Sequence, residues 1–292
     1  MATLADGLIQ PAAEPRRRNR ALARFLRHRA AVVALAVVVL FVLVEVLAPA
    51  IAPYDPMQTD WAAVRKAPSA AHWLGTDELG RDLLSRMIWG CRASLLAGVV
   101  SVVIAIAIGL PLGLIAGYVG GWTDGLISRF TDALLACPFL ILAIALAAFL
   151  GPSLTNAMIA IGISVTPIFI RLARGQVLVV KVEDFVEAAR AVGNPPYRIL
   201  LRHILPNVMP PVLVQSTLAI ATAIIAEASL SFLGVGQQPP APSWGSMLNV
   251  AKDFMSQAPW MALWPGLAIC LIVLAFNVLG DGLRDALDPK QQ

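Results

Sequence analysis

The side chains that perform catalysis or bind metals are few in this sequence and stand far apart. The three histidines, His28, His72 and His203, lie in different segments, and the three cysteines are isolated from one another. Such scatter supports neither a metal cluster nor a nucleophile paired with a base. No segment has the G-x-x-x-x-G-K-[S/T] pattern that cradles a phosphate. We therefore predict no catalytic residue, no metal and no cofactor bound by this chain.

A carboxylate within a long apolar run is the next candidate for function. Glu227 lies near the end of such a run. An ionisable group at membrane depth is costly and usually faces a cavity or a partner. One hypothesis makes Glu227 a pathway or gate residue. The alternative is an interfacial glutamate that reaches water.

The composition indicates a membrane protein. Apolar residues make up 58% of the 292 residues, charged residues only 14%, and the mean hydropathy is +0.76. Soluble domains have roughly 45–50% apolar and about 25% charged residues. The excess lies in charge-free runs, and runs of about 18 or more apolar residues are typical of transmembrane helices. We predict an all-α, polytopic membrane protein with about six transmembrane helices.

The apolar runs divide the chain into spans and connecting segments. The first span is residues 30–48, and it follows a basic arm, residues 1–29. A polar segment, residues 49–92, leads to a core of residues 93–283, and residues 284–292 form a tail. The predicted spans of the core are residues 93–117, 126–150, 154–170, 208–233 and 261–279.

The positions of the cations predict the orientation. Seven arginines precede residue 30, and residues 171–207 add six Lys and Arg side chains. Lys and Arg in short loops favour the cytoplasmic side. With six spans, both termini and the segment 171–207 are then cytoplasmic, and the segment 49–92 is extracytoplasmic.

The segment 171–207 has the pattern of two short helices. Glu183 and Asp184 suit a helix N-terminus, and Gly193 suits a C-terminal stop. Phe185, Ala188, Ala189 and Val192 then share one face. A second helix is predicted at residues 197–203, with Pro206 ending the segment before the fifth span. This element could fit a partner's groove, with Phe185, Ile199 and Leu200 as anchors, or lie on the lipid surface.

The same segment resembles the EAA loop of bacterial ABC importer permeases. Glu187-Ala188-Ala189 is followed by Gly193 and then by Leu205-Pro206. The general pattern has Ile where this chain has His203, but residues 202–207, Arg-His-Ile-Leu-Pro-Asn, match the peptide and nickel subfamily. The resemblance implies that Glu187, Ala188, Ala189 and Gly193, with Phe185, Leu205 and Pro206, belong to a coupling helix that docks on an ATP-binding subunit.

Four further blocks, residues 72–82, 227–234, 242–245 and 277–289, are similar to the C-type dipeptide, oligopeptide and nickel permeases. The resemblance implies the type I ABC importer permease fold in a bacterial inner membrane, with peptides as cargo, or nickel chelates or glutathione-like solutes as the alternative. It also implies a second homologous permease subunit, two ATP-binding subunits that carry ATP and Mg²⁺, an extracytoplasmic substrate-binding protein and the lipid bilayer as partners, and no nucleic acid.

The block at residues 72–82 suggests one contact with these partners. Asp77 and Arg81 are hypothesised to help dock the substrate-binding protein. The alternative is a self-contained loop fold, because Thr, Asp and Arg side chains cap turns and pair charges. Two other classes of function would leave different marks on the sequence. An ion-coupled secondary transporter should show several buried carboxylates and repeated broken helices, and an intramembrane enzyme should show a catalytic pair; Glu227 is the one carboxylate that suits the former.

Overall fold

The computed structural model describes residues 23–287, and every regular element named within this range is a helix. Four helices are long: α4 (Leu83–Val119), α7 (Leu154–Val180), α10 (Leu205–Phe232) and α12 (Trp260–Leu287). The others are α2 (Arg29–Val46), α3 (Ala48–Ile51), η1 (Trp61–Ala63), α5 (Gly121–Leu135), α6 (Phe139–Leu150), α8 (Asp184–Ala191), α9 (Pro196–Arg198), η2 (Ile199–Ile204), α11 (Trp244–Ala251) and η3 (Lys252–Phe254).

Five of the described helical segments are long and apolar enough to cross a membrane. They are α2, α4, α7, α12 and the continuous stretch Pro196–Phe232, which contains α10. The pair α5 and α6 passes the same test together, but the two helices meet at 89°. Counting this pair as one broken span gives six, which confirms the predicted fold class.

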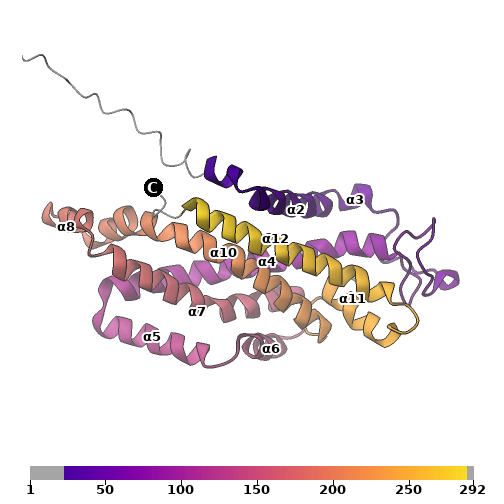
Figure 1. Cartoon of the computed structure of the whole chain (residues 1–292). Helices are drawn as coiled ribbons and strands as arrows, with labels where there is room; N and C mark the ends of the chain where they lie inside the picture. The colour runs from indigo at the N-terminus through magenta and orange to yellow at the C-terminus, as the bar shows by residue number, and fades with distance from the viewer. Residues whose placement is uncertain (1–22, 288–292) are drawn as a thin grey trace, which may run out of the picture.

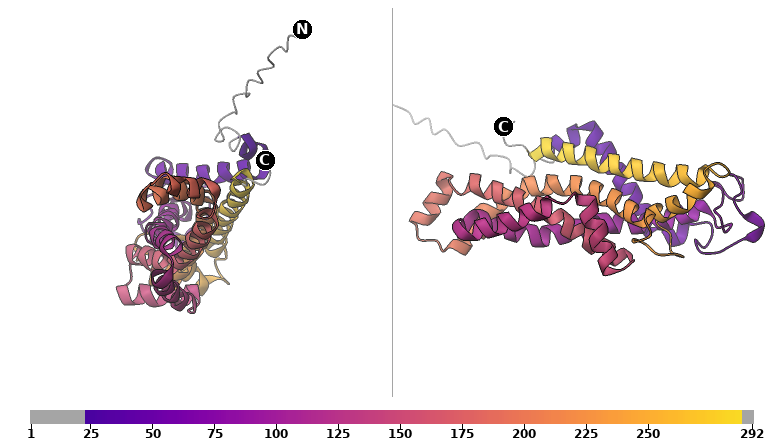
Figure 2. Two further views of the ribbon diagram at one scale, coloured as in Figure 1. Left: turned by 90° about the vertical axis from the view of Figure 1, so that its left-hand side faces the viewer. Right: turned by 90° about the horizontal axis from the view of Figure 1, so that it is seen from below.

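The long helices lie side by side in one elongated bundle (Figures 1 and 2). The segment of residues 182–204 that carries α8, called the knob, projects from one end, and α11 lies near the other end with the irregular segment that follows α3. The start of α2 and the end of α12 both point towards the knob. This arrangement places the predicted coupling loop and the predicted extracytoplasmic segment at opposite ends, as the three crossings between them require.

The closest packing in the core joins α4 to α7 through glycines at every fourth position. Gly109, Gly113 and Gly117 of α4 face the backbone of α7. A methyl group added at Gly113 would lie 2.6 Å from the carbonyl oxygen of Ile170 and 2.6 Å from Cβ of Ala173. Small residues at this spacing let membrane helices approach closely and gain van der Waals contact. α4 and α7 thus form the rigid centre, and α10, α12 and α2 pack outward from it.

Several predicted spans are shorter than the helices that contain them in the structure. α4 begins at Leu83, ten residues before the predicted span, because Asp82 caps its first turn by accepting a hydrogen bond from the backbone N–H of Ser85 (2.8 Å). α7 continues ten residues beyond residue 170, and α12 extends at least to Leu287. Polar residues at a membrane boundary do not end a helix, because the backbone hydrogen bonds of a helix are internal and can continue outside the membrane.

The predicted second short helix of the segment 171–207 is not a separate element. α9 and the π-helix η2 run directly into α10, so Pro206 lies in the first turn of α10 and does not end the segment. Pro206 has no N–H to donate to the preceding turn, so it interrupts the regular hydrogen-bond ladder at this point without ending the helix. The wider π-turn, in which the N–H of Leu205 donates to the carbonyl of Leu200, joins the pieces.

Candidate functional site

The knob, defined as residues 182–204, projects beyond the helix bundle (Figure 1). α8 begins at Asp184, with Asp184 and Glu187 in its first turn and Arg190 in its last. These charges complement the helix dipole, and they confirm the predicted helix start. After α8, Gly193 has φ +83°. Its N–H donates to the carbonyl of Arg190 (2.8 Å), and the next N–H, of Asn194, donates to that of Ala189 (3.2 Å). This hydrogen-bond pair is a Schellman motif, which confirms Gly193 as the helix stop.

One face of the knob packs against the helix bundle, and the other face is exposed. Val186, Ala189 and Ile199 are buried in the main hydrophobic cluster. Phe185, Glu187 and Ala188 are exposed, and so is Pro206, while Leu205 is half-buried. Ile199 was predicted as a partner anchor, and the structure corrects this: it fastens the knob to its own bundle. Ala189 likewise packs inward, so a partner can reach Phe185 and Ala188 but not Ala189.

Three exposed apolar side chains on the knob were not predicted. Val182, Tyr197 and Leu201 are each more than half exposed, and Val192, which was placed on the α8 face, is the most exposed of all at 84%. A group of exposed apolar residues at one projecting end indicates a surface that contacts another protein or the membrane. Tyr197 and Leu201 lie four positions apart in the continuous helix, a spacing that places two side chains on one face, so this spacing could have found them.

The opposite end contains a tightly folded loop between η1 and α4. Asp77 and Arg81 are buried there. Arg81 Nε donates to Asp77 Oδ2 (2.6 Å), and Arg81 Nη2 donates to Glu78 Oε1 (2.7 Å). Arg86 of α4 lies against the same Asp77 oxygen (3.3 Å) and donates to the carbonyl of Pro56 (2.9 Å). Two arginines and two carboxylates thus balance each other in a buried cluster, which satisfies charges that would otherwise be costly to bury.

This geometry corrects the docking hypothesis for Asp77 and Arg81. Both side chains point into the loop and leave almost no surface for a second protein to contact. Thr76 belongs to the same structure, since its hydroxyl donates to the carbonyl of Ala63 and accepts from the N–H of Lys66 (2.8 Å). The structure therefore matches the alternative, a self-contained loop fold. The pKa of Glu78 is raised above its ordinary value, first by burial and then by the negative charge of Asp77.

Glu227 is fully buried within α10, which excludes the interfacial glutamate that reaches water. Its Oε2 accepts a hydrogen bond from Ser94 of α4 (3.0 Å), and its Oε1 accepts one from Ser231 (2.7 Å). The Ser231 hydroxyl in turn accepts from the backbone N–H of Gln237 (3.0 Å). The carboxylate connects α4, α10 and the following loop. It lines neither the cavity beside Trp89 nor the one between α5 and α7, so the gate hypothesis has no support in this geometry.

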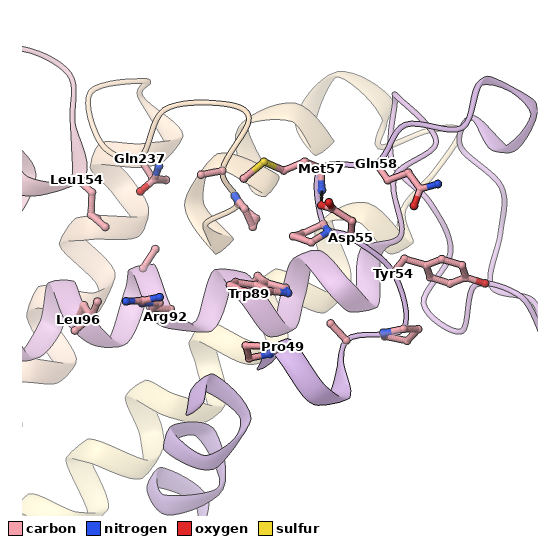
Figure 3. Close-up of a pocket in the computed structure, with 16 residues that line it drawn as sticks. Pro49, Tyr54, Asp55, Met57, Gln58, Trp89, Arg92, Leu96, Leu154 and Gln237 are labelled. Atoms are coloured by element: carbon pink, nitrogen blue, oxygen red, sulfur yellow. Dashed lines mark hydrogen bonds between the residues drawn. The ribbon is translucent and has the colours of Figure 1, made fainter. Parts of the chain in front are cut away.

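A cavity of about 830 Å³ lies near the loop end of the bundle (Figure 3). α4 contributes Trp89, Arg92 and Leu96, and Leu154 comes from the start of α7. Residues 52–58, which include Tyr54 and Asp55, and residues 237–242 complete the wall. The mixed lining, with a ring system, a cation and an anion, is of the kind that fixes the orientation of a polar organic molecule.

Comparisons with known proteins identify the family. Residues 109–292 match the family described as binding-protein-dependent transport system inner membrane component. Residues 18–68 match the N-terminal transmembrane domain of oligopeptide transport permease C. These two regions together cover both the first membrane span and most of the core.

Individual relatives agree with the family models. The chain is 47% identical to the dipeptide transport system permease protein DppC of Alkalihalophilus pseudofirmus, over 91% of this chain and 88% of that one. It is 52% identical to the glutathione transport system permease protein GsiD of Shigella flexneri, with the same coverage. Among solved structures, inward-facing MetNI methionine ABC transporter superposes with a TM-score of 0.57 at 21% identity, over 70% of this chain and 97% of that chain.

The arrangement of spans, the projecting knob and these matches lead to one conclusion, which confirms the resemblance seen in the EAA loop. The chain belongs to the binding-protein-dependent transport system inner membrane components, and it is a multi-pass inner-membrane permease of the ABC importer class.

Proposed function

We propose that this chain forms half of a translocation pathway for di- or oligopeptides, including glutathione-like peptides. The support is the identity of about half the residues shared with relatives whose names specify dipeptide and glutathione transport. Both names describe cargo that carries a free amino group and a free carboxylate. Nickel chelates, the other cargo considered, have no such support among these relatives.

The knob is the proposed site at which ATP hydrolysis in a partner drives the transporter. Phe185, Glu187 and Ala188 form an exposed surface, while Val186, Ala189 and Ile199 transmit its position to the bundle. Gly193, Leu205 and Pro206 set the path of the chain between α8 and α10. Two ATP-binding subunits, carrying ATP and Mg²⁺, would each grip one such knob, and the second permease subunit would supply the other. Coupling requires that the motor bind the knob differently in its two states.

The proposed orientation places the knob, and with it both termini, in the cytoplasm. The cations of residues 171–207 support this, because Lys and Arg near membrane spans favour that side. The loop with buried Asp77 and Arg81, and the cavity beside Trp89 and Arg92, then face outward. An extracytoplasmic substrate-binding protein would deliver cargo to this face as a whole, without direct contact from Asp77 or Arg81.

Reconstitution tests the proposal. The chain, its second permease, its ATP-binding subunits and its binding protein are placed in vesicles, and uptake of radiolabelled dialanine, glutathione and Ni²⁺ is measured with and without ATP. We expect ATP-dependent uptake of at least one peptide and none when the ATP-binding subunits are left out. Uptake without those subunits would refute the coupling role and favour an ion-coupled carrier.

A further inference from the structure

A second cavity, of about 460 Å³, lies between α5 and α7. Its walls combine opposite charges with hydroxyl groups, and they come from only these two helices. The residues that line it are Ser128, Thr131, Asp132, Ile170, Arg171 and Arg174. Figure 1 shows α5 running alongside α7 over this part of the bundle.

Two ion pairs join the helices here, and the first one is held by two parallel hydrogen bonds. Arg174 Nε and Nη2 donate to the two carboxylate oxygens of Asp124 at 2.5 and 2.7 Å. The hydroxyl of Ser128 donates to the same carboxylate (3.1 Å). Paired, bidentate contacts of this kind hold a fixed geometry. Arg174 and Asp124 therefore serve to fasten α5 to α7.

The second pair has free bonding capacity. Arg171 Nη2 and Asp132 Oδ1 are 2.6 Å apart, and this is the one hydrogen bond that either side chain makes within the described part of the chain. Both side chains are 60% exposed. A guanidinium has five N–H donors and a carboxylate accepts at two oxygens, so most donors of Arg171 and one oxygen of Asp132 are available to a ligand.

The exposed charges and the shape of the chain favour water or protein over lipid as the neighbour of this cavity. α5 has 15 residues, so it extends about 22 Å, less than the roughly 30 Å thickness of the hydrocarbon layer. The chain then breaks at residues 136–138, and α6 departs at 89°. Irregular backbone and exposed charges at membrane depth occur only where they are buried in protein or line water. This side of α5 and α7, towards the knob end of the bundle, therefore suits a space lined by water or protein.

We propose that the cavity between α5 and α7 is a binding site for zwitterionic cargo on its way through the membrane. Arg171 binds the carboxylate of the cargo in a bidentate contact, and Asp132 binds its ammonium group. The proposal rests on the proposed function, which supplies peptides as the cargo. A volume of this size falls within the roughly 300–1,000 Å³ of small-molecule sites, and a dipeptide fits it.

A protection assay tests the site without requiring transport. In the full nucleotide-free complex, Cys91, Cys137 and Cys270 are replaced by alanine and Ser128→Cys is introduced as a reporter in the cavity wall. The rate at which a membrane-impermeant methanethiosulfonate labels this cysteine is measured with millimolar dialanine and with the same dipeptide capped at both ends. We expect dialanine to slow labelling several-fold and the capped form to have no effect. Arg171→Gln or Asp132→Asn should abolish the protection, and Arg129→Gln, which removes a cation from α5 outside the cavity, should not.

Several results would overturn the site. The first is a cysteine at position 128 that the reagent does not label, and the second is equal protection by the capped dipeptide. The third is protection that survives both Arg171→Gln and Asp132→Asn, measured in complexes that keep their size-exclusion profile. ATP-driven dialanine uptake in the same preparation separates the two proposals. Uptake without protection refutes the cavity and leaves the importer function standing, whereas protection without uptake of any peptide refutes the proposed function and supports the cavity.

Discussion

The hydroxyl of Ser94 on α4 donates a hydrogen bond of 3.0 Å to Glu227 on α10, 133 positions later in the chain, and both residues are buried. Removing the acceptor leaves the hydroxyls of Ser94 and Ser231 without it, and a buried polar group without a partner costs roughly 1–3 kcal/mol. We expect Glu227→Ala to lower the melting temperature of the purified complex clearly. Glu227→Gln keeps an acceptor oxygen and should lower it less. Equal losses for the two variants would show that the negative charge, and not the hydrogen bonding, matters at this position.

The contact of Gly113 with α7 gives a second prediction. A Cβ at this position would meet the backbone of α7, which cannot move aside as a flexible side chain can. Overpacking of a tight core costs about 1–3 kcal/mol, so Gly113→Ala should destabilise the complex in a detergent melting experiment. Gly175→Ala on α7 is the matched control, because no atom of this chain lies within 4 Å of its added methyl group. An unchanged melting temperature for Gly113→Ala would mean that α4 and α7 can separate at no cost.

Local patterns in the sequence predicted those features that depend on neighbouring residues. The apolar runs gave the number of spans, and Glu183, Asp184 and Gly193 gave the limits of α8. The spacing of Gly109, Gly113 and Gly117 also signals close helix packing, and it could have been used to pair α4 with α7. The span predicted at residues 126–150 is broken by 89° just before α6, at Pro138; a proline shows where a helix bends but not by how much.

Other features depend on partners far apart in the chain. The sequence around Glu227 would be the same whether its side chain faced a cavity or two serines. Only the fold brings Ser94 close to it. The same is true of Asp132 and Arg171, which are 39 positions apart. Asp77 and Arg81 were ambiguous because a charged loop can turn its charges outward to a partner or inward to each other, and burial alone distinguishes these cases.

The buried cluster in the external loop predicts a pH dependence. The pKa of Glu78 is raised in the folded state, chiefly by burial, so the ionised carboxylate lowers the free energy of unfolding. That cost is present above the raised pKa and is relieved as pH falls through it. Glu78→Gln should therefore melt at a higher temperature than the unsubstituted protein at neutral pH, and the difference should shrink on acidification. A difference that grows as pH falls would reverse the sign and refute the assignment.

Phe185 and Val186 are adjacent on α8, yet they differ sharply in exposure. Phe185 is 43% exposed and Val186 is fully buried. We expect Phe185→Ala to weaken binding of the ATP-binding subunit while leaving the melting temperature of the isolated permease pair unchanged. Val186→Ala should lower that melting temperature, since deleting buried methyl groups typically costs about 1 kcal/mol or more. The two measurements together separate docking from folding. Loss of stability in Phe185→Ala would contradict the proposed docking surface.

Gly193 provides the sharpest test of the knob, because its constraint is conformational and not steric. Its φ is +83°, and no atom lies within 4 Å of where a Cβ would be. Valine is strongly disfavoured in this left-handed region, whereas asparagine tolerates it better than other side chains do. We expect Gly193→Val to displace α8 and to reduce the uptake obtained per ATP hydrolysed, measured in vesicles, with normal membrane insertion. Gly193→Asn should keep most of the coupling. If both variants transported normally, the angle at which α8 leaves the chain would have no part in transmitting force, and the knob would be at most a passive contact.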